Sequence, residues 1–163
     1  MVSWREVSVD DPVAHQLLVE YFDSRVDGFP ASQGPYRRTV PEAKDFVPPS
    51  GVFLVVEAEG VDGERADVGC GGIRRIGPNA AGAIRFELKH LWLRPHTRGR
   101  GYGRALLVEL ERRAGAFGAE ELVLDTNASL TAAGGLYRSS GYASIAAYND
   151  NPNATDWYAK ALP

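Results

Sequence analysis

The chain has 163 residues, 44% of them hydrophobic, which is enough for one sizeable core and too short for two ordinary domains. A formal net charge of −3 and a pI of about 5.6 argue against general nucleic-acid binding. One cysteine excludes an intramolecular disulfide, no apolar run approaches about 18 residues, and no signal-peptide pattern opens the chain, so we expect a cytoplasmic protein without a membrane span.

The hydrophobic and turn patterns along the chain predict strands and helices in mixed order. In chain order we expect a strand at 2–9, a helix at 11–25, an irregular stretch to about residue 50, strands at 52–58, 68–76 and 84–93, a helix from 102 to about 117, a strand at 121–126, a helix at 130–139, and closing strands at 142–148 and 156–162. This order predicts a mixed α/β layer with antiparallel hairpins and one parallel pair of strands.

A stretch rich in glycine and arginine, residues 98–104, lies between the strand at 84–93 and the helix that begins at Tyr102. A helix N-terminus attracts anions through its aligned peptide dipoles and unpaired N–H groups, and glycines at 99, 101 and 103 let a ligand touch the backbone. Residues 94–113 carry six Arg and two Glu, a net charge of +4, which leaves −7 for the remainder. The spacing fits neither a Rossmann nor a P-loop signature, but it still predicts a phosphate site.

Two motifs resemble those of the GNAT family of N-acetyltransferases. Arg98-x-x-Gly101-x-Gly103 at a helix start is similar to the family's coenzyme-A pyrophosphate loop, and the segment 133–142, Ala-x-x-Leu-Tyr-Arg-Ser-Ser-Gly-Tyr, is similar to its fourth-helix signature. The tail at 148–160 resembles a bacterial branch that acts on small molecules. The resemblance covers residues 52–163 and implies a mostly antiparallel central sheet with a parallel strand pair splayed around acetyl-CoA and helices on both faces.

The resemblance also implies how the chain is divided. We expect a single N-acetyltransferase domain over 1–163, with an acceptor-side region at 1–50, an acetyl-CoA-binding core at 82–126, and the fourth helix and closing strands at 127–163. The residues expected to contact acetyl-CoA are Leu91, Trp92, Leu93, Arg98, Gly99, Arg100, Gly101, Tyr102, Gly103, Arg104 and Asn127. Asn127 has an equal alternative as a cap of the next helix, with Ser129 as its competitor.

Transfer of an acetyl group to an amine requires a neutral amine, and at pH 7 a lysine-like amine must lose its proton at a cost of about 4 to 5 kcal/mol. The resemblance places Glu87 where many members hold the carboxylate that takes this proton, often through water. The alternative is a surface glutamate paired with Arg85 or Lys89. His90 is a rival base, and on a regular strand it lies on the face opposite Glu87 unless a bulge realigns the two.

Tyr137 matches the tyrosine that, in the family, protonates the departing thiolate, and its alternative is a core aromatic of an amphipathic helix. A backbone N–H near 91–93 is expected to meet the negative carbonyl oxygen. Cys70 is expected to be a small buried strand residue. The three histidines have no metal-ligand spacing, so we expect no metal.

The acceptor is expected to be a small primary amine, such as an amino acid derivative, a polyamine or an amine-bearing antibiotic. The aromatic residues that could line its pocket are Phe22, Phe29, Tyr36, Phe46, Tyr148 and Trp157. The acidic remainder favours a cationic amine. Alternatives are a noncatalytic acyl-CoA-binding or sensor module and a protein or peptide N-acetyltransferase, whereas a nucleic-acid-binding domain is disfavoured. Dimers are common in the family, which leaves a homodimer open.

Overall fold

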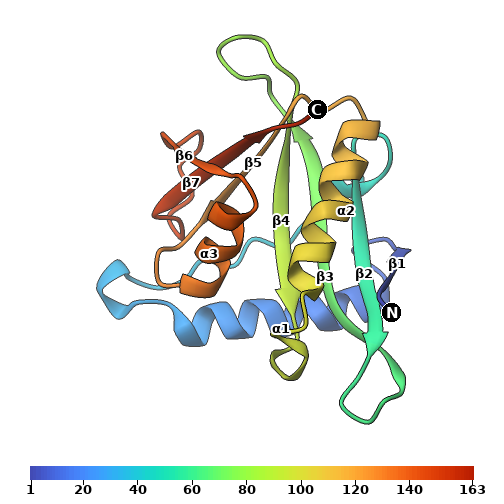
Figure 1. Ribbon diagram of the computed structural model, residues 1–163. Helices are drawn as coiled ribbons and strands as arrows, with labels where there is room; N and C mark the ends of the chain where they lie inside the picture. Colours follow the sequence, from blue (N-terminus) through green and yellow to red (C-terminus); the bar gives the residue numbers. More distant parts are fainter.

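The computed structural model describes all residues 1–163 (Figure 1). Its elements in chain order are β1 (Ser3–Glu6), α1 (Pro12–Gly28), the 3-10 turns η1 (Ala31–Gln33) and η2 (Ala43–Phe46), β2 (Gly51–Glu59), β3 (Arg65–Ile76), β4 (Arg85–Leu93), the 3-10 turn η3 (Pro95–Thr97), α2 (Tyr102–Ala116), β5 (Glu121–Thr126), α3 (Thr131–Ser139), β6 (Ala143–Ile145) and β7 (Asp156–Ala161). None of the helices combines the length and the apolarity that a membrane crossing needs.

The seven strands form one sheet in the order β1-β2-β3-β4-β5-β7-β6. All neighbours are antiparallel except β4 and β5, which run parallel. This parallel pairing joins only residues 85–87 to residues 121–123, although both strands continue beyond it. Past that point β4 and β5 diverge and open the middle of the sheet (Figure 1). The expected mixed fold with a splayed parallel pair is confirmed.

Helices cover both faces of the sheet. The buried strand β2 shows why, because its side chains alternate between two apolar clusters. Leu54 and Val56 pack in the cluster that holds Leu106 of α2, and Phe53 packs in the cluster that holds Leu17 of α1. In Figure 1, α2 lies in front of the sheet and α1 crosses behind it. Helix α1 therefore lies on one face of the sheet at the opening between β4 and β5. The glycine-rich loop leads into α2, which lies on the opposite face.

Most element boundaries agree with the sequence expectation, and the differences have local causes. Helix α1 starts where Asp11 caps it by accepting from the backbone N–H of Val13 at 2.9 Å, and it continues to Gly28. Strand β6 ends at Ile145 rather than near 148. β6 pairs with β7 only at 143–145, and Asn149, whose Oδ1 accepts from Trp157 Nε1 at 2.9 Å, lies in a bend farther along the chain.

Candidate active site

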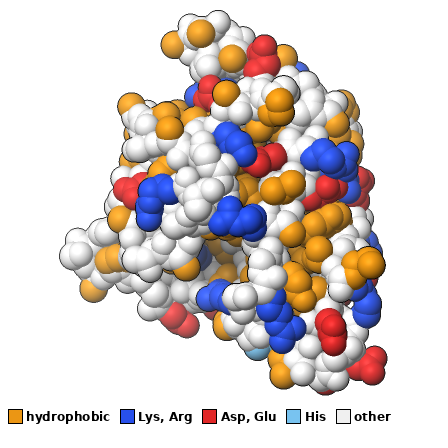
Figure 2. Space-filling view, viewed as in Figure 1, with side chains coloured by type: hydrophobic (Ala, Val, Ile, Leu, Met, Phe, Trp, Pro, Cys, Tyr) orange, Lys and Arg blue, Asp and Glu red, His pale blue; other side chains and the backbone are white.

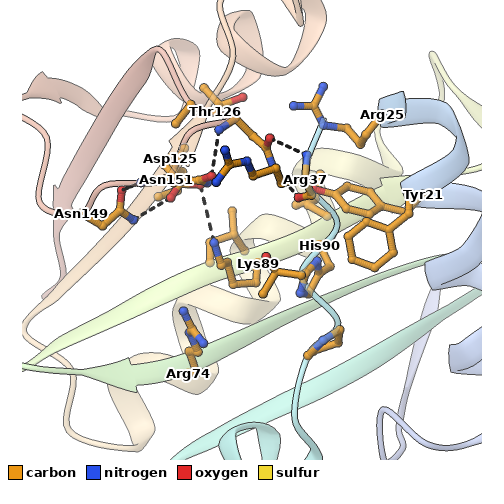
Figure 3. A pocket seen from close by; sticks show the side chains of 18 of the residues that line it. Tyr21, Arg25, Arg37, Arg74, Lys89, His90, Asp125, Thr126, Asn149 and Asn151 are labelled. Atoms are coloured by element: carbon orange, nitrogen blue, oxygen red, sulfur yellow. Dashed lines mark hydrogen bonds and ion pairs between the residues drawn. The ribbon is translucent and has the colours of Figure 1, made fainter. Parts of the chain in front are cut away.

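A cavity of about 370 Å³ lies where β4 and β5 separate (Figure 3). The N-terminal region, both diverging strands, α3 and the closing loop all line it. Its residues are Tyr21, Phe22, Arg25, Tyr36, Arg37, Thr39, Val40, Pro41, Glu42, Asp45, Phe46, Arg74, Leu88, Lys89, His90, Leu91, Leu124, Asp125, Thr126, Leu130, Ala133, Tyr137, Asn149, Asn151, Pro152, Asn153 and Ala154. Its location, beside exposed edges of a split sheet, is typical of a ligand site.

A β-bulge in β4 shapes the floor of the cavity. Lys89 pairs with Gly72 and Trp92 with Cys70, so two residues of β4 lie opposite one residue of β3. His90, one of these two, has φ +57°, a left-handed conformation that is uncommon outside glycine. The bulge changes the alternation, so that His90 contacts α1 on the same side of the sheet as Glu87. The alternation expected for a regular strand is therefore wrong at this point.

The His90 ring packs edge-on to Tyr21 and Phe22, with centroids 5.5 and 5.6 Å away. Its Nδ1 is buried and has no hydrogen-bond partner. Burial and, to a lesser extent, the nearby positive charges of Lys89 and Arg74 lower the pKa of His90 to about 3. The imidazole is consequently neutral at physiological pH and forms part of the cavity wall.

Glu87 lies behind the wall rather than in it. Its side chain is 2% exposed, and it does not line the cavity. Arg74 donates to its Oε1 from Nε at 3.0 Å and from Nη2 at 2.9 Å, and the Tyr148 hydroxyl donates to its Oε2 at 2.7 Å. Burial and, to a lesser extent, the negative charge of Glu87 raise the pKa of Tyr148. The Tyr148 hydroxyl therefore keeps its proton. Arg74 and Lys89, which both line the cavity, separate this carboxylate from the open space.

Tyr137 lines the cavity from α3 and is 6% exposed. Its ring packs against Tyr142 and Tyr158, with centroids 5.9 and 6.2 Å away. Burial raises the pKa of Tyr137, so the phenol is protonated at neutral pH. Tyr137 is therefore a core aromatic that also lines the cavity, and its role as the acid stays a prediction.

The glycine-rich loop carries positive charge that the chain does not neutralise. Arg98 donates from Nε to the Leu93 carbonyl at 3.0 Å, Arg100 donates to the Glu59 carbonyl at 3.1 Å, and Arg104 donates to the Ser139 and Ser140 hydroxyls at 2.7 and 2.9 Å. None of these three guanidinium groups pairs with a carboxylate, whereas the other arginines of the +4 segment, Arg94, Arg112 and Arg113, all do. Figure 2 shows basic side chains around a hollow between α2 and α3.

The backbone of the loop suits an anion. Gly99 and Gly101 have φ +81° and +82°, and Gly101 precedes the first turn of α2. Residues with a side chain rarely adopt this conformation, so the glycines are required for the loop's path to the helix N-terminus. Tyr102 and Gly103 then open the helix, where unpaired N–H groups point out of the first turn.

The strand residues expected near acetyl-CoA fall into two groups. Leu91 lines the cavity. Trp92 is buried in the α1-side cluster and Leu93 in the α2-side cluster, so only their main chains remain for a ligand. Past residue 87, β4 has no partner strand on the β5 side, and its backbone edge is free along the cleft.

Asn127 is fully buried and its side chain is engaged within the protein. Its Nδ2 donates to Gln33 Oε1 at 2.7 Å and to the Asn153 carbonyl at 3.0 Å, while its Oδ1 accepts from Ser129 N at 3.0 Å. The last bond forms an Asx turn just ahead of α3, whose cap position is Leu130 and has no side-chain cap. A contact from Asn127 to acetyl-CoA stays a prediction, and both Nδ2 donors of the side chain are already used within the protein.

Several cavity residues escaped the sequence reasoning. Of the expected aromatic residues, Phe22, Tyr36 and Phe46 line the cavity, whereas Phe29, Tyr148 and Trp157 do not. The cationic residues of the wall were missed, and Arg25 is the clearest case. It follows Leu18 and Phe22 on the buried face of α1, at positions i+7 and i+3. A charged residue on an otherwise apolar helix face was the available signal.

Comparison with known proteins gives the family. The acetyltransferase (GNAT) family model matches residues 14–142. An uncharacterised N-acetyltransferase of Schizosaccharomyces pombe is 31% identical over 109 residues, which are 67% of this chain and 62% of that protein. A Klebsiella pneumoniae structure assigned as an acyl-CoA N-acyltransferase is 25% identical, with a TM-score of 0.71 over 99% of this chain and 98% of the other.

Two more distant structures share the fold. A GNAT-family acetyltransferase of Staphylococcus aureus Mu50 has a TM-score of 0.74 at 14% identity and is covered completely, as is this chain. A GNAT-family acetyltransferase of Elizabethkingia anophelis, solved with acetyl-CoA bound, has a TM-score of 0.62 at 15% identity over 99% of this chain and 98% of that one. The chain therefore belongs to the acetyltransferase (GNAT) family.

Proposed function

We propose that this chain transfers the acetyl group of acetyl-CoA to the primary amine of a small molecule by direct attack, as expected for a small-molecule branch of the family. The observation that carries the proposal is the cavity at the β4/β5 opening, because it joins the β4 edge, Tyr137 and the N-terminal region in one space. A volume of about 370 Å³ suits a small molecule. The cavity draws its lining from 1–50, 82–126 and 127–163, together with Arg74 of β3, which supports a single domain.

The residues present fit acetyl-CoA. Arg98, Arg100 and Arg104 are free of carboxylates and would hold its phosphates together with the N–H groups at the start of α2. The free edge of β4 at 91–93 would hold the pantetheine chain and offer an N–H to the carbonyl oxygen. When bound, the thioester supplies an activated acetyl group.

The amine must lose its proton before it attacks the carbonyl carbon. Protonation of a neutral imidazole with a pKa of about 3 costs about 5 kcal/mol at pH 7, so His90 is a poor acceptor. Glu87 remains the proposed base. Neither Glu87 nor Tyr148, whose hydroxyl donates to Glu87 at 2.7 Å, lines the cavity, so the proton would reach the carboxylate through water rather than by direct contact.

Tyr137 is the proposed acid. As the carbon–nitrogen bond forms and the carbon–sulfur bond breaks, the electron pair leaves on sulfur and needs a proton. The buried phenol of Tyr137 still carries its proton at neutral pH and lies in the cavity wall. The ammonium proton thus goes to Glu87, and the nitrogen gives up a second proton once the carbon–nitrogen bond has formed. The thiolate takes a proton from Tyr137, whose phenol is restored by that second proton, so one proton is released overall.

The proposal is tested by calorimetric titration with acetyl-CoA, coenzyme A and ATP, followed by free-thiol release over a panel of amines, peptides and folded proteins. Selective binding of the CoA compounds with faster release on small amines is the expected result. Faster acetylation of peptides or proteins would favour the protein-directed alternative. Binding without turnover on any acceptor would favour a sensor module.

A further inference from the structure

Arg25 is a buried cation for which the chain provides no anion. It lies in the last part of α1, is 8% exposed, and lines the cavity. Its Nη1 has no hydrogen-bond partner, and no carboxylate lies within ion-pair distance of it. Its guanidinium carbon lies 5.3 Å from the centroid of the Tyr36 ring. Burial of an unpaired charge is costly, so a position of this kind points to an external anion.

The other charges of the cavity do not compensate Arg25. Each lining carboxylate already has a cationic partner, with Asp125 at 3.6 Å from Lys89, Asp45 at 4.0 Å from Arg74, and Glu42 at 3.2 Å from Lys44. Asp125 also accepts from Asn149 Nδ2 at 2.7 Å. The uncompensated charge of the cavity is therefore positive.

Arg37 adds a second unpaired cation, although this residue is exposed rather than buried. Its backbone is fixed in both directions by Asn153, whose Oδ1 accepts from Arg37 N at 2.9 Å and whose Nδ2 donates to the Arg37 carbonyl at 2.7 Å. Its guanidinium lines the cavity and enters no ion pair. Arg37 follows Tyr36, the residue under Arg25, and Figure 3 shows both arginines beside the same cavity. Two unpaired guanidinium groups thus belong to one side of the site.

We propose that the acceptor is an amine that also carries a carboxylate, an amino-acid-class substrate whose carboxylate binds Arg25 with support from Arg37. A guanidinium presents two parallel N–H donors to a carboxylate, which is the geometry this pairing needs. The rings of Tyr21, Phe22 and Phe46 in the same wall favour an apolar or aromatic side chain. The inference rests on the proposed function and narrows its acceptor, since a polyamine offers no anion to Arg25.

Acceptor pairs that differ only in the carboxylate test the inference in the unaltered protein. Phenylalanine is compared with phenethylamine, and lysine with cadaverine, by free-thiol release and by calorimetric binding in the presence of coenzyme A. The amino acid of each pair is expected to show about 10- to 100-fold higher kcat/KM and tighter binding. Equal or better performance of the decarboxylated amines overturns the inference. If no acceptor is turned over, only the proposed function is contradicted. The calorimetric preference for the amino acid over its decarboxylated amine still tests the carboxylate site.

A variant pair identifies the residue. Arg25→Gln is expected to raise KM for phenylalanine about 10- to 100-fold and to abolish the preference over phenethylamine, with the KM for acetyl-CoA unchanged. Arg38→Gln is the matched control, because Arg38 is exposed, pairs with Asp23 at 2.6 Å and does not line the cavity. A preference that survives in Arg25→Gln refutes the assignment. If that variant does not fold, the acceptor pairs in the unaltered protein still decide it.

Discussion

Gly103 offers a substitution whose effects on stability and on acetyl-CoA binding have opposite signs. It lies in the first turn of α2 with an ordinary helical φ, unlike Gly101 at φ +82°, where any side chain strains the backbone. A Cβ at Gly103 meets only Leu136 Cδ2 at 3.6 Å and Leu93 Cδ2 at 3.9 Å, which are normal van der Waals contacts. Alanine therefore fits the ligand-free protein without displacement of its neighbours.

The expected magnitudes follow from these contacts. Gly→Ala within a helix stabilises by up to about 1 kcal/mol, equal to a rise of roughly 2 to 4 °C in Tm for a chain of this length. In the complex, the added methyl group stands at the helix end predicted to hold the phosphates and prevents their close approach to the backbone. We expect the Kd for acetyl-CoA to rise at least about tenfold, or about 1.4 kcal/mol.

Calorimetric titration with acetyl-CoA and thermal denaturation of the ligand-free protein measure the two effects. Gly115→Ala is the matched control, because Gly115 lies at the other end of α2 and a Cβ there has no neighbour within 4 Å. It is expected to raise Tm without a change in Kd. A Gly103→Ala variant with raised Tm and unchanged Kd would refute the reasoning that the backbone at this glycine approaches the phosphates.

Three further predictions concern the cavity wall and the buried carboxylate behind it. Glu87→Gln is expected to lower kcat about 100-fold with unchanged calorimetric affinity for acetyl-CoA, and loss of kcat in His90→Asn instead would reassign the base. Tyr137→Phe keeps the ring packing and removes the proton donor, so kcat is expected to fall about 100-fold at nearly constant Tm; an unchanged kcat would leave Tyr137 a packing residue. The folded-state pKa of His90, about 3, lies below the unfolded value, so its contribution to the free energy of unfolding is complete above about pH 6.5 and is lost as pH falls toward 3. Urea denaturation of His90→Asn, which tolerates φ +57°, should show a weaker decline over that range, and identical profiles would contradict the pKa shift.

Local patterns were sufficient to predict much of the fold. The α2 helix and the loop before it depend on helical spacing and on glycine positions within some twenty residues, and the observed helix, Tyr102–Ala116, follows that pattern. The buried strand β2 was predicted from its continuous apolar run. In each case the residues that decide the structure are close together in the sequence.

The bulge and the cavity wall could not be predicted in this way. The left-handed conformation of His90 depends on the pairing of β4 with β3, where Cys70 also donates its thiol to the His90 carbonyl at 3.5 Å. The segment at 36–46 is placed by contacts with distant residues, such as the bonds between Arg37 and Asn153 across 116 positions. No short-range pattern encodes such contacts, so the acceptor side of the site was the least predictable.

For the choice of acceptor, the unpaired charges inside the cavity matter more than the net charge summed along the sequence. The net charge of −7 carried by the residues outside 94–113 favours a cationic acceptor. Most of those charges, however, lie on the surface, where salt screens them beyond about 8 Å. Arg25, buried and unpaired, acts on a bound group at contact distance, where the low local dielectric makes the interaction much stronger. A ligand inside the cavity therefore responds to Arg25 and Arg37 more than to the outer field. An amino acid satisfies both demands, because it brings a carboxylate to these arginines and an amine to the free edge of β4.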